Sequence, residues 1–133
     1  MSSDPVALEP GTLIGSYEIV RPLGKGGMGH VYLAEHAVLG RLVAVKVLSP
    51  KDSADPVLVQ RFQREGRALG RLKHESNLSV IDFGQTEDGG FYLVTDLLRG
   101  RTLDTILRAE GALEPRRVVR LLAQALDALA EAH

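Results

Sequence analysis

Two patterns of apolar positions divide the chain. In the first hundred residues, short runs rich in β-branched and aromatic residues predict five strands, at 17–23, 30–36, 42–48, 78–83 and 91–97. The first two runs flank a cluster of glycines, and this order predicts a hairpin. Longer stretches with helical spacing predict helices from about 56 to 73, near 102–109 and over 115–132.

Two charged residues interrupt these apolar patterns. Lys46 lies inside the run 42–48, which is otherwise apolar, and Glu65 lies in the middle of an apolar helical stripe made by Leu58, Phe62, Leu69 and Leu72. Taken singly, each has an ordinary explanation, because an edge lysine can reach water and a glutamate can lie on a solvated helix face. If both point inward, each supplies the partner that a buried charge needs, and breaking such a pair costs about 3–5 kcal/mol.

Composition narrows the class of protein. The chain has 133 residues, of which 44% are hydrophobic and 25% charged, as in one globular domain or a piece of a larger one. Its net charge is −1, so the chain has no excess of positive charge that would indicate binding to nucleic acid or an anionic membrane. The absence of cysteine excludes disulfides, thiolate metal sites and a cysteine nucleophile, and the four histidines lack ligand spacing, so we expect no metal site.

The apolar runs also bear on location. Residues 1–12 lack the pattern of a signal peptide, and no run approaches the roughly 18 apolar residues of a membrane span. We therefore expect this chain to be cytoplasmic, with a membrane anchor further downstream left open.

Four glycines lie within residues 23–29, and three kinds of loop compete for them. A dinucleotide-binding turn requires a helix directly after the glycines and an acidic residue about twenty positions on, whereas here a strand follows and Lys46 stands near that position. A P-loop requires Gly-Lys-Ser/Thr, which Met28-Gly29-His30 does not supply. A glycine-rich hairpin without a ligand is the third possibility. Beside a lysine held by a glutamate, however, bare N–H groups form a phosphate clamp, which favours binding of a nucleoside triphosphate.

Four motifs in this order resemble one family. The stretch 23–31 (LGKGGMGHV) matches G-x-G-x-x-G-x-V, and 43–46 (VAVK) matches the V-A-I-K strand. Glu65 resembles the helix glutamate that pairs with that lysine, and 91–98 (FYLVTDLL) resembles the strand leading into a hinge. Over about residues 14–133 the chain is similar to protein kinases, specifically the bacterial eukaryotic-like (Hanks-type) serine/threonine protein kinases.

The resemblance implies an α+β fold. Residues 1–13 would be a flexible segment, and 14–133 a protein kinase domain truncated before its catalytic loop. Within it, 14–94 would form an N-lobe with an antiparallel five-stranded sheet plus one helix, 95–100 a hinge, and 101–133 the first helices of an incomplete C-lobe.

The resemblance also implies roles for individual residues. Lys46 would hold the α- and β-phosphates of ATP, and Glu65 would orient Lys46. Thr95 would be the gatekeeper before the hinge, where the backbones of Asp96 and Leu98 would bind adenine. The expected nucleotide-binding set is Leu23, Gly24, Lys25, Gly26, Gly27, Met28, Gly29, His30, Val31, Ala44, Lys46, Thr95, Asp96 and Leu98, with Val31 and Ala44 as an apolar ceiling.

The catalytic loop and the magnesium ligands of the family would lie beyond His133. We therefore expect ATP and Mg²⁺ to be ligands of a complete domain, and no phosphate transfer from these residues alone. Asp82-Phe83-Gly84 matches the family's magnesium-binding triplet, but it precedes the hinge strand, so we expect a chance match. The protein substrate and the oligomeric state stay undetermined, and the residues alone do not separate serine/threonine from tyrosine specificity.

Some features depart from the family or favour other functions. Asn77 stands where relatives usually carry an apolar residue. Gly66 and Gly70 each lower helix propensity by about 1 kcal/mol, which indicates a mobile helix, close packing or neutral drift. We also expect the helix 115–132 to be poorly anchored. The main alternative function is a pseudokinase-like module that binds a nucleotide or a partner without catalysis, and a weaker one is a ligand-free β-rich domain.

Overall fold

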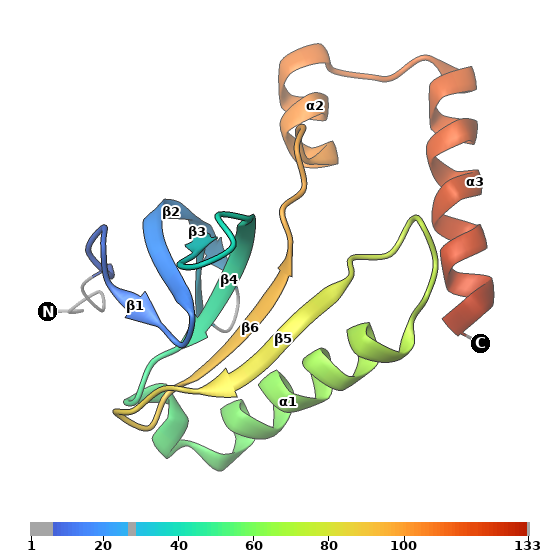
Figure 1. Cartoon of the computed structure of the whole chain (residues 1–133). Helices are drawn as coiled ribbons and strands as arrows, with labels where there is room; N and C mark the ends of the chain where they lie inside the picture. Colours follow the sequence, from blue (N-terminus) through green and yellow to red (C-terminus); the bar gives the residue numbers. More distant parts are fainter. Residues whose placement is uncertain (1–6, 27–28, 133) are drawn as a thin grey trace, which may run out of the picture.

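The computed structural model describes residues 7–26 and 29–132, which form a curled antiparallel sheet, one helix packed on it, and two helices that stand apart (Figure 1). The strand order is β1-β2-β3-β4-β6-β5, and each neighbouring pair is antiparallel. The strands are β1 (Leu13–Ile14), β2 (Tyr17–Gly26), β3 (Gly29–His36), β4 (Leu42–Leu48), β5 (Val80–Gln85) and β6 (Phe91–Asp96).

The predicted α+β class is confirmed, with one correction to the strand count. The sheet has six strands instead of five, because the two-residue β1 pairs with the start of β2 across a turn at Gly15, which has a φ of +58°. Two residues are too few to show an alternating pattern, so β1 has no signal in the sequence. The expected flexible segment 1–13 lies partly outside the described residues. From Leu8 onward it is bonded to the sheet, since the Leu8 N–H donates to the Tyr32 hydroxyl at 3.1 Å.

Alternation along β4 sorts its side chains between two apolar clusters. Val43 and Val45 lie on one face, in a cluster with residues of β2, β3 and β6. Leu48 lies on the other face, where it packs with Phe62 and Leu93 under the helix. By the same alternation, Lys46 shares the face of Leu48, which is the face that the helix covers.

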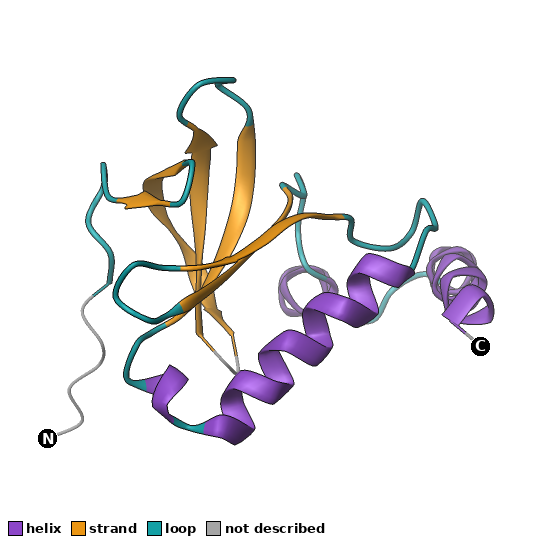
Figure 2. Cartoon of the chain, turned by 60° about the horizontal axis from the view of Figure 1, so that its bottom comes forward, coloured by secondary structure: helices purple, strands orange, loops and turns teal. Residues whose placement is uncertain are grey.

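The packed helix is α1 (Pro56–Arg71), which runs along the sheet in Figure 2 after a short 3₁₀ turn, η1 (Asp52–Ala54). Asp55 caps its N-terminus by accepting a hydrogen bond from the Val57 N–H at 2.9 Å, and Pro56 occupies its first turn as predicted. The helix ends two residues before the predicted position, because Leu72 is already extended.

The remaining helices, α2 (Leu103–Glu110) and α3 (Pro115–Ala132), stand away from the sheet (Figure 1). Within α3 the one buried residue is Ala128. Four apolar side chains on its predicted inner face are 36 to 62% exposed: Val118, Leu122, Leu126 and Leu129. A hydrogen bond of 3.2 Å from the Lys73 N–H to Glu131 Oε1 links the helix to the segment after α1. In the part of the chain that the structure describes, no helix is long and apolar enough to span a membrane.

Candidate functional site

Lys46 and Glu65 form an ion pair between the sheet and α1. Lys46 Nζ lies 3.0 Å from both carboxylate oxygens of Glu65, nineteen positions away in the chain. Their side chains are 17% and 32% exposed, so the pair is shielded from water but still reachable from one side. The structure thus brings together the two charges that interrupt the apolar patterns of the sequence.

The pair lines a cleft of about 280 Å³ beside the inner strands β3, β4 and β6 and the helix α1. One wall comes from β3 and β4 through Val31 and Ala44, and the far end is formed by the segment that follows β6. The lining residues are Leu23, Val31, Ala44, Lys46, Glu65, Leu69, Leu78, Leu93, Thr95, Asp96, Leu97 and Leu98. An apolar slot with one ion pair in its wall can accommodate a flat ring and an anionic group together.

Four leucines of this cleft lie outside the predicted set: Leu69, Leu78, Leu93 and Leu97. Two of them have a signal in the sequence. Leu69 follows Glu65 by one helical turn, and Leu93 precedes Thr95 by two strand residues, so each shares a face with a predicted site residue. The predicted residues that line the cleft are Leu23, Val31, Ala44, Lys46, Glu65, Thr95, Asp96 and Leu98.

The glycine hairpin joins β2 to β3, with Gly26 paired to Gly29. Gly27 and Met28 lie outside the described residues, and Lys25 and Gly26 are described by their backbone alone. Gly29 has a φ of +150°, and a Cβ there would collide with the carbonyl oxygen of Val47, so the fold itself requires glycine. Gly24 faces open space, with no atom within 4 Å of the position that a Cβ would occupy, so packing does not explain it.

His30 is placed differently from the rest of the predicted set. Together with Tyr32 it lines a separate cavity of about 180 Å³, which shares no lining residue with the cleft. Any contact between His30 and a nucleotide would therefore have to come from its backbone, and its role stays a prediction.

The segment after Thr95 has a defined backbone geometry. Thr95 is 7% exposed and pairs with Ala44 on β4 and Val80 on β5. The Asp96 N–H donates to the Ser79 carbonyl at 3.0 Å, so it is already used. The Asp96 carbonyl accepts a long hydrogen bond of 3.4 Å from Thr95 Oγ1, and a carbonyl can accept a second bond.

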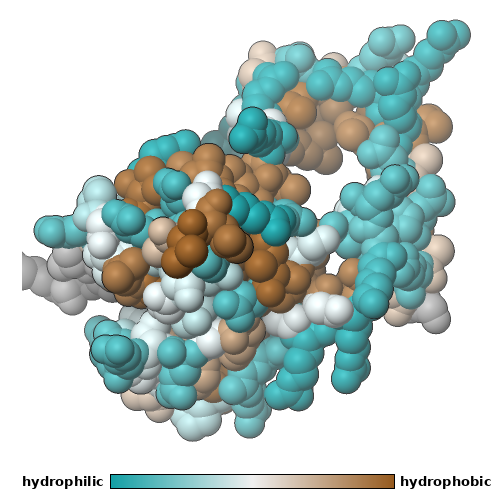
Figure 3. Space-filling view, in the orientation of Figure 1, coloured by the Kyte–Doolittle hydropathy of each residue, from teal (hydrophilic) through white to brown (hydrophobic). Residues whose placement is uncertain are grey.

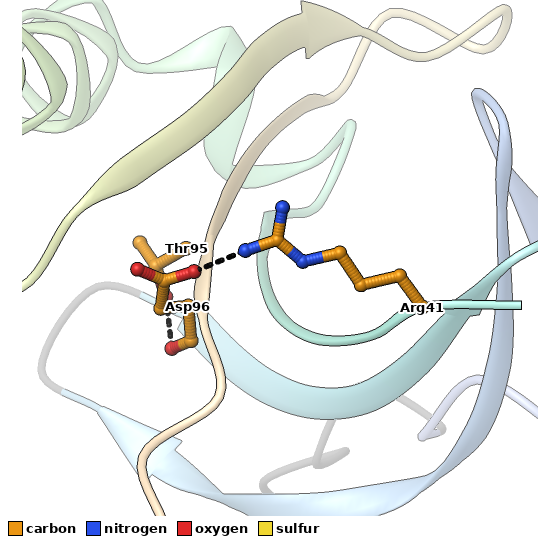
Figure 4. A network of polar contacts seen from close by, with 3 residues as sticks. All are labelled: Arg41, Thr95 and Asp96. Atoms are coloured by element: carbon orange, nitrogen blue, oxygen red, sulfur yellow. Dashed lines mark hydrogen bonds and ion pairs between the residues drawn. The ribbon is translucent and has the colours of Figure 1, made fainter. Parts of the chain in front are cut away.

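The Asp96 side chain points away from this backbone group and toward the turn between β3 and β4 (Figure 4). Its Oδ1 lies 2.6 Å from Arg41 Nη2, and the two side chains are 39% and 59% exposed. This ion pair, which is exposed to water, links the end of β6 to the turn that precedes β4.

Comparison with known proteins decides the family, since the protein kinase domain family matches residues 17–133. The chain belongs to the protein kinase domain family. It is 41% identical over 122 residues to the serine/threonine-protein kinase pkn3 of Myxococcus xanthus, covering 92% of this chain and 22% of that one. It is 40% identical over 131 residues to the serine/threonine-protein kinase PknH of Mycobacterium tuberculosis, covering 98% of this chain and 21% of that protein.

Solved kinase structures agree with this assignment. The crystal structure of the PknI kinase domain from Mycobacterium tuberculosis matches 96% of this chain with a TM-score of 0.76 at 33% sequence identity. This kinase chain spans 52% of that domain and about a fifth of the curated relatives it matches. The architecture is therefore that of the N-terminal part of a kinase domain.

The Asp82-Phe83-Gly84 triplet of this kinase chain lies in β5, before β6, and contacts within the fold account for each member. Asp82 Oδ2 accepts a hydrogen bond from the Tyr17 hydroxyl at 3.3 Å. The Phe83 ring lies between those of Phe62 and Phe91, with centroids 5.7 and 6.2 Å away. Among residues 7–26 and 29–132, no group of three or more histidine, aspartate or glutamate side chains could hold a metal ion.

Gly84 completes the triplet by leaving room for Tyr92. A Cβ at Gly84 would lie 2.5 Å from Tyr92 Cζ, closer than any real contact. Burial raises the pKa of both Tyr17 and Tyr92, and the negative charge of Asp82 raises each further. Asp82 and Gly84 thus contact a tyrosine cluster that belongs to the face of the sheet remote from the Lys46–Glu65 pair.

The two glycines of α1 differ in their surroundings. Gly66 is buried, and a Cβ there would lie 3.2 Å from Phe83 and 3.5 Å from Leu93, so close packing accounts for it. Gly70 is exposed, and nothing lies within 4 Å of a Cβ built on it. Asn77, which stands where relatives usually carry an apolar residue, is also unusual in the structure. Its Nδ2 is buried without a hydrogen-bond partner among the described residues.

Proposed function

We propose that this chain is the ATP-binding part of a serine/threonine protein kinase, which transfers the γ-phosphate of ATP to serine or threonine of a protein. The Lys46–Glu65 ion pair inside the cleft is the observation that carries the proposal. A lysine on a central strand and a glutamate on the packed helix are the two groups that protein kinases need for positioning phosphates.

The residues of the cleft fit the nucleotide chemically. Val31 and Ala44 provide apolar surface for a purine, and the Asp96 carbonyl and the backbone of Leu98 would provide polar groups at its edge. Lys46 would hold phosphate oxygens, and Glu65 would keep its ammonium group in place. ATP would supply the phosphoryl group, and the glycines at 24, 26 and 29 would let backbone N–H groups approach the triphosphate.

We expect these residues alone to bind ATP without transferring phosphate. Kinases use an aspartate of the catalytic loop to accept the substrate proton and further groups to hold Mg²⁺. We expect these groups to lie in the part of the domain that the chain does not span, since it covers 52% of a solved kinase domain. In an assay with radiolabelled ATP, the purified chain should label no protein substrate, and robust labelling would contradict this expectation.

Nucleotide binding can be tested with a fluorescent ATP analogue and the 133-residue chain. Lys46→Met should weaken binding at least about ten-fold, because it removes charge-assisted hydrogen bonds to phosphate. Lys51→Met is the matched control, since Lys51 is exposed and does not line the cleft, and its affinity should equal that of the wild type. Equal affinity of the Lys46→Met and wild-type chains, with both folded by circular dichroism, would refute the proposal.

A pseudokinase-like binding module is the second candidate, because the exposed apolar face of α3 offers a surface for a partner. Both candidates bind nucleotide at the same cleft, so affinity does not separate them. The sequence encoded downstream of His133 does: a catalytic-loop stretch H-R-D-x-K-x-x-N supports the enzyme, and its absence supports the module.

A further inference from the structure

The histidine that follows the glycine hairpin has a buried ring nitrogen without a described partner. His30 lies in β3 directly after Gly29, and its Nε2 is buried with no hydrogen-bond partner among the described residues. Leaving a buried polar atom without a partner costs free energy. The nitrogen is therefore a place for a hydrogen-bonding group from outside the part of the chain that the structure describes.

The cavity of about 180 Å³ that His30 lines is mostly apolar. It lies between the start of the described chain, the ladder of β3 and β4, and the turn between β5 and β6. Its lining residues are Leu8, Ile14, His30, Tyr32, Val47, Leu48, Ser49, Pro50, Thr86 and Asp88. An apolar cavity of about 150 Å³ holds one benzene molecule, so this one is large enough for a single six-membered ring with a small substituent.

Several polar groups of the cavity wall already have partners within the chain. The Thr86 hydroxyl donates to Asp88 Oδ1. The Ser49 hydroxyl donates to Asp52 Oδ2 at 2.9 Å and accepts from the Asp52 N–H at 3.1 Å. A buried water molecule makes about three hydrogen bonds, and these groups leave few for it besides His30. An apolar ring with one hydroxyl needs only one such partner and fills the remaining space.

A larger hollow adjoins the cavity and gives access to it. The hollow has a volume of about 690 Å³, and the residues common to both spaces are Leu8, Ile14, Thr86 and Asp88. Its wall includes Leu13, which is 62% exposed, and Figure 3 shows apolar surface where β1 and β2 run in Figure 1. Asp88 and Glu87 are exposed on the same wall, so the entrance is acidic and disfavours an anionic ligand.

We propose that this cavity is a binding site for an uncharged single-ring phenol. The hydroxyl would pair with His30 Nε2, and the ring would lie among the apolar side chains. A hydroxyl can donate or accept a hydrogen bond, so it suits the imidazole nitrogen in either tautomer. His30 and its ladder partner Val47 both line the cavity, so a bound phenol would contact β3 where the glycine hairpin ends. The cavity shares no lining residue with the cleft, so the proposal does not rest on nucleotide binding.

Titrations followed by two-dimensional amide NMR test the proposal on the 133-residue chain. The probe is para-cresol, compared with toluene, which lacks the hydroxyl, and with para-hydroxybenzoate, which is an anion. With para-cresol the largest shifts should occur at amides of the three segments that meet at the cavity, around Leu8, His30 and Thr86. Para-hydroxybenzoate should bind more weakly than para-cresol, because its carboxylate would approach the acidic entrance.

A pair of matched variants tests the role of His30. In His30→Leu the ratio of the para-cresol affinity to the toluene affinity should fall by about five-fold or more, because the hydroxyl loses its partner. The control is His74→Leu, the same change at another half-buried histidine that lines a separate groove, and its ratio should equal that of the wild type. Circular dichroism verifies that both variants are folded, and if His30→Leu does not fold, the location of the amide shifts in the wild type decides.

Three results would overturn the proposal. The first is that para-cresol does not bind the wild type, or binds more weakly than para-hydroxybenzoate. The second is that its amide shifts are confined to residues of the cleft such as Lys46 and Thr95. The third is an unchanged affinity ratio in a folded His30→Leu chain.

Discussion

Replacing Gly84 by alanine tests whether packing accounts for the Asp82-Phe83-Gly84 triplet. The new Cβ would lie 2.5 Å from Tyr92 Cζ and 2.7 Å from Cε1, where no atoms can coexist. The ring cannot swing away freely, because Tyr92 is 8% exposed and a turn glycine, Gly15, confines its other side. Overpacking of this kind costs about 1–3 kcal/mol, a large part of the roughly 5–15 kcal/mol that stabilises a domain.

Urea denaturation followed by far-UV circular dichroism measures this loss as a lower midpoint. The matched control is Gly70→Ala, the same chemical change at an exposed helix position with free space around it, and it should stabilise the chain by about 0.5–1 kcal/mol. The two substitutions should therefore shift the midpoint in opposite directions. In the Gly84→Ala background, Tyr92→Leu should cost less than it does alone, because it relieves the collision. A Gly84→Ala chain as stable as the wild type would show that the packing argument is wrong.

Three further predictions concern other contacts. Tyr17→Phe, which removes the hydrogen bond to Asp82, should cost about 1 kcal/mol in urea denaturation at neutral pH. Folding raises the pKa of Tyr17 above its ordinary value of 10.0, so the contribution of Tyr17 to the stability of the fold is complete below that pH. This contribution is lost as the pH rises through the raised pKa. The Tyr17→Phe variant should therefore lose stability less steeply than the wild type in that alkaline range. Arg41→Ala should change the free energy of unfolding by less than about 1 kcal/mol, because the ion pair with Asp96 is exposed to water. Leu126→Gln should change the thermal midpoint of this chain little, since Leu126 is 62% exposed, and a large drop would mean that α3 is packed in solution.

Strands with strong patterns can be predicted from the sequence, whereas the ends of irregular segments cannot. The strand β4 has the predicted bounds because seven consecutive β-favouring positions, with Lys46 as the single exception, leave little ambiguity. The strand β5 begins two residues after its predicted start. Leu78 and Ser79 have the residue types expected in the strand, but the pairing of β5 with β6 begins only at Val80. Nothing in a local pattern indicates where pairing stops.

The ion pair of the cleft can be inferred because both partners break an apolar pattern. A charge at an inward position needs a partner, and this requirement links Lys46 to Glu65 across nineteen residues. The pair Arg41–Asp96 cannot be inferred in the same way, because Arg41 lies in a turn, where a charge is ordinary, and 55 residues separate it from Asp96. The additional leucines of the cleft escape prediction because an apolar residue on a buried face is explained by the core alone.

The detached α2 and α3 leave the molecule with more water contact than its mass would suggest. Its accessible surface is 9416 Å², whereas a compact protein of 14.4 kDa exposes about 6,800 Å². The excess is about 2,600 Å², larger than the roughly 1,600 Å² that a standard protein–protein complex buries in total. Any partner that binds over the exposed leucines would stabilise this chain by mass action. The melting temperature of the chain should therefore depend on whether such a partner is bound, as well as on its own sequence.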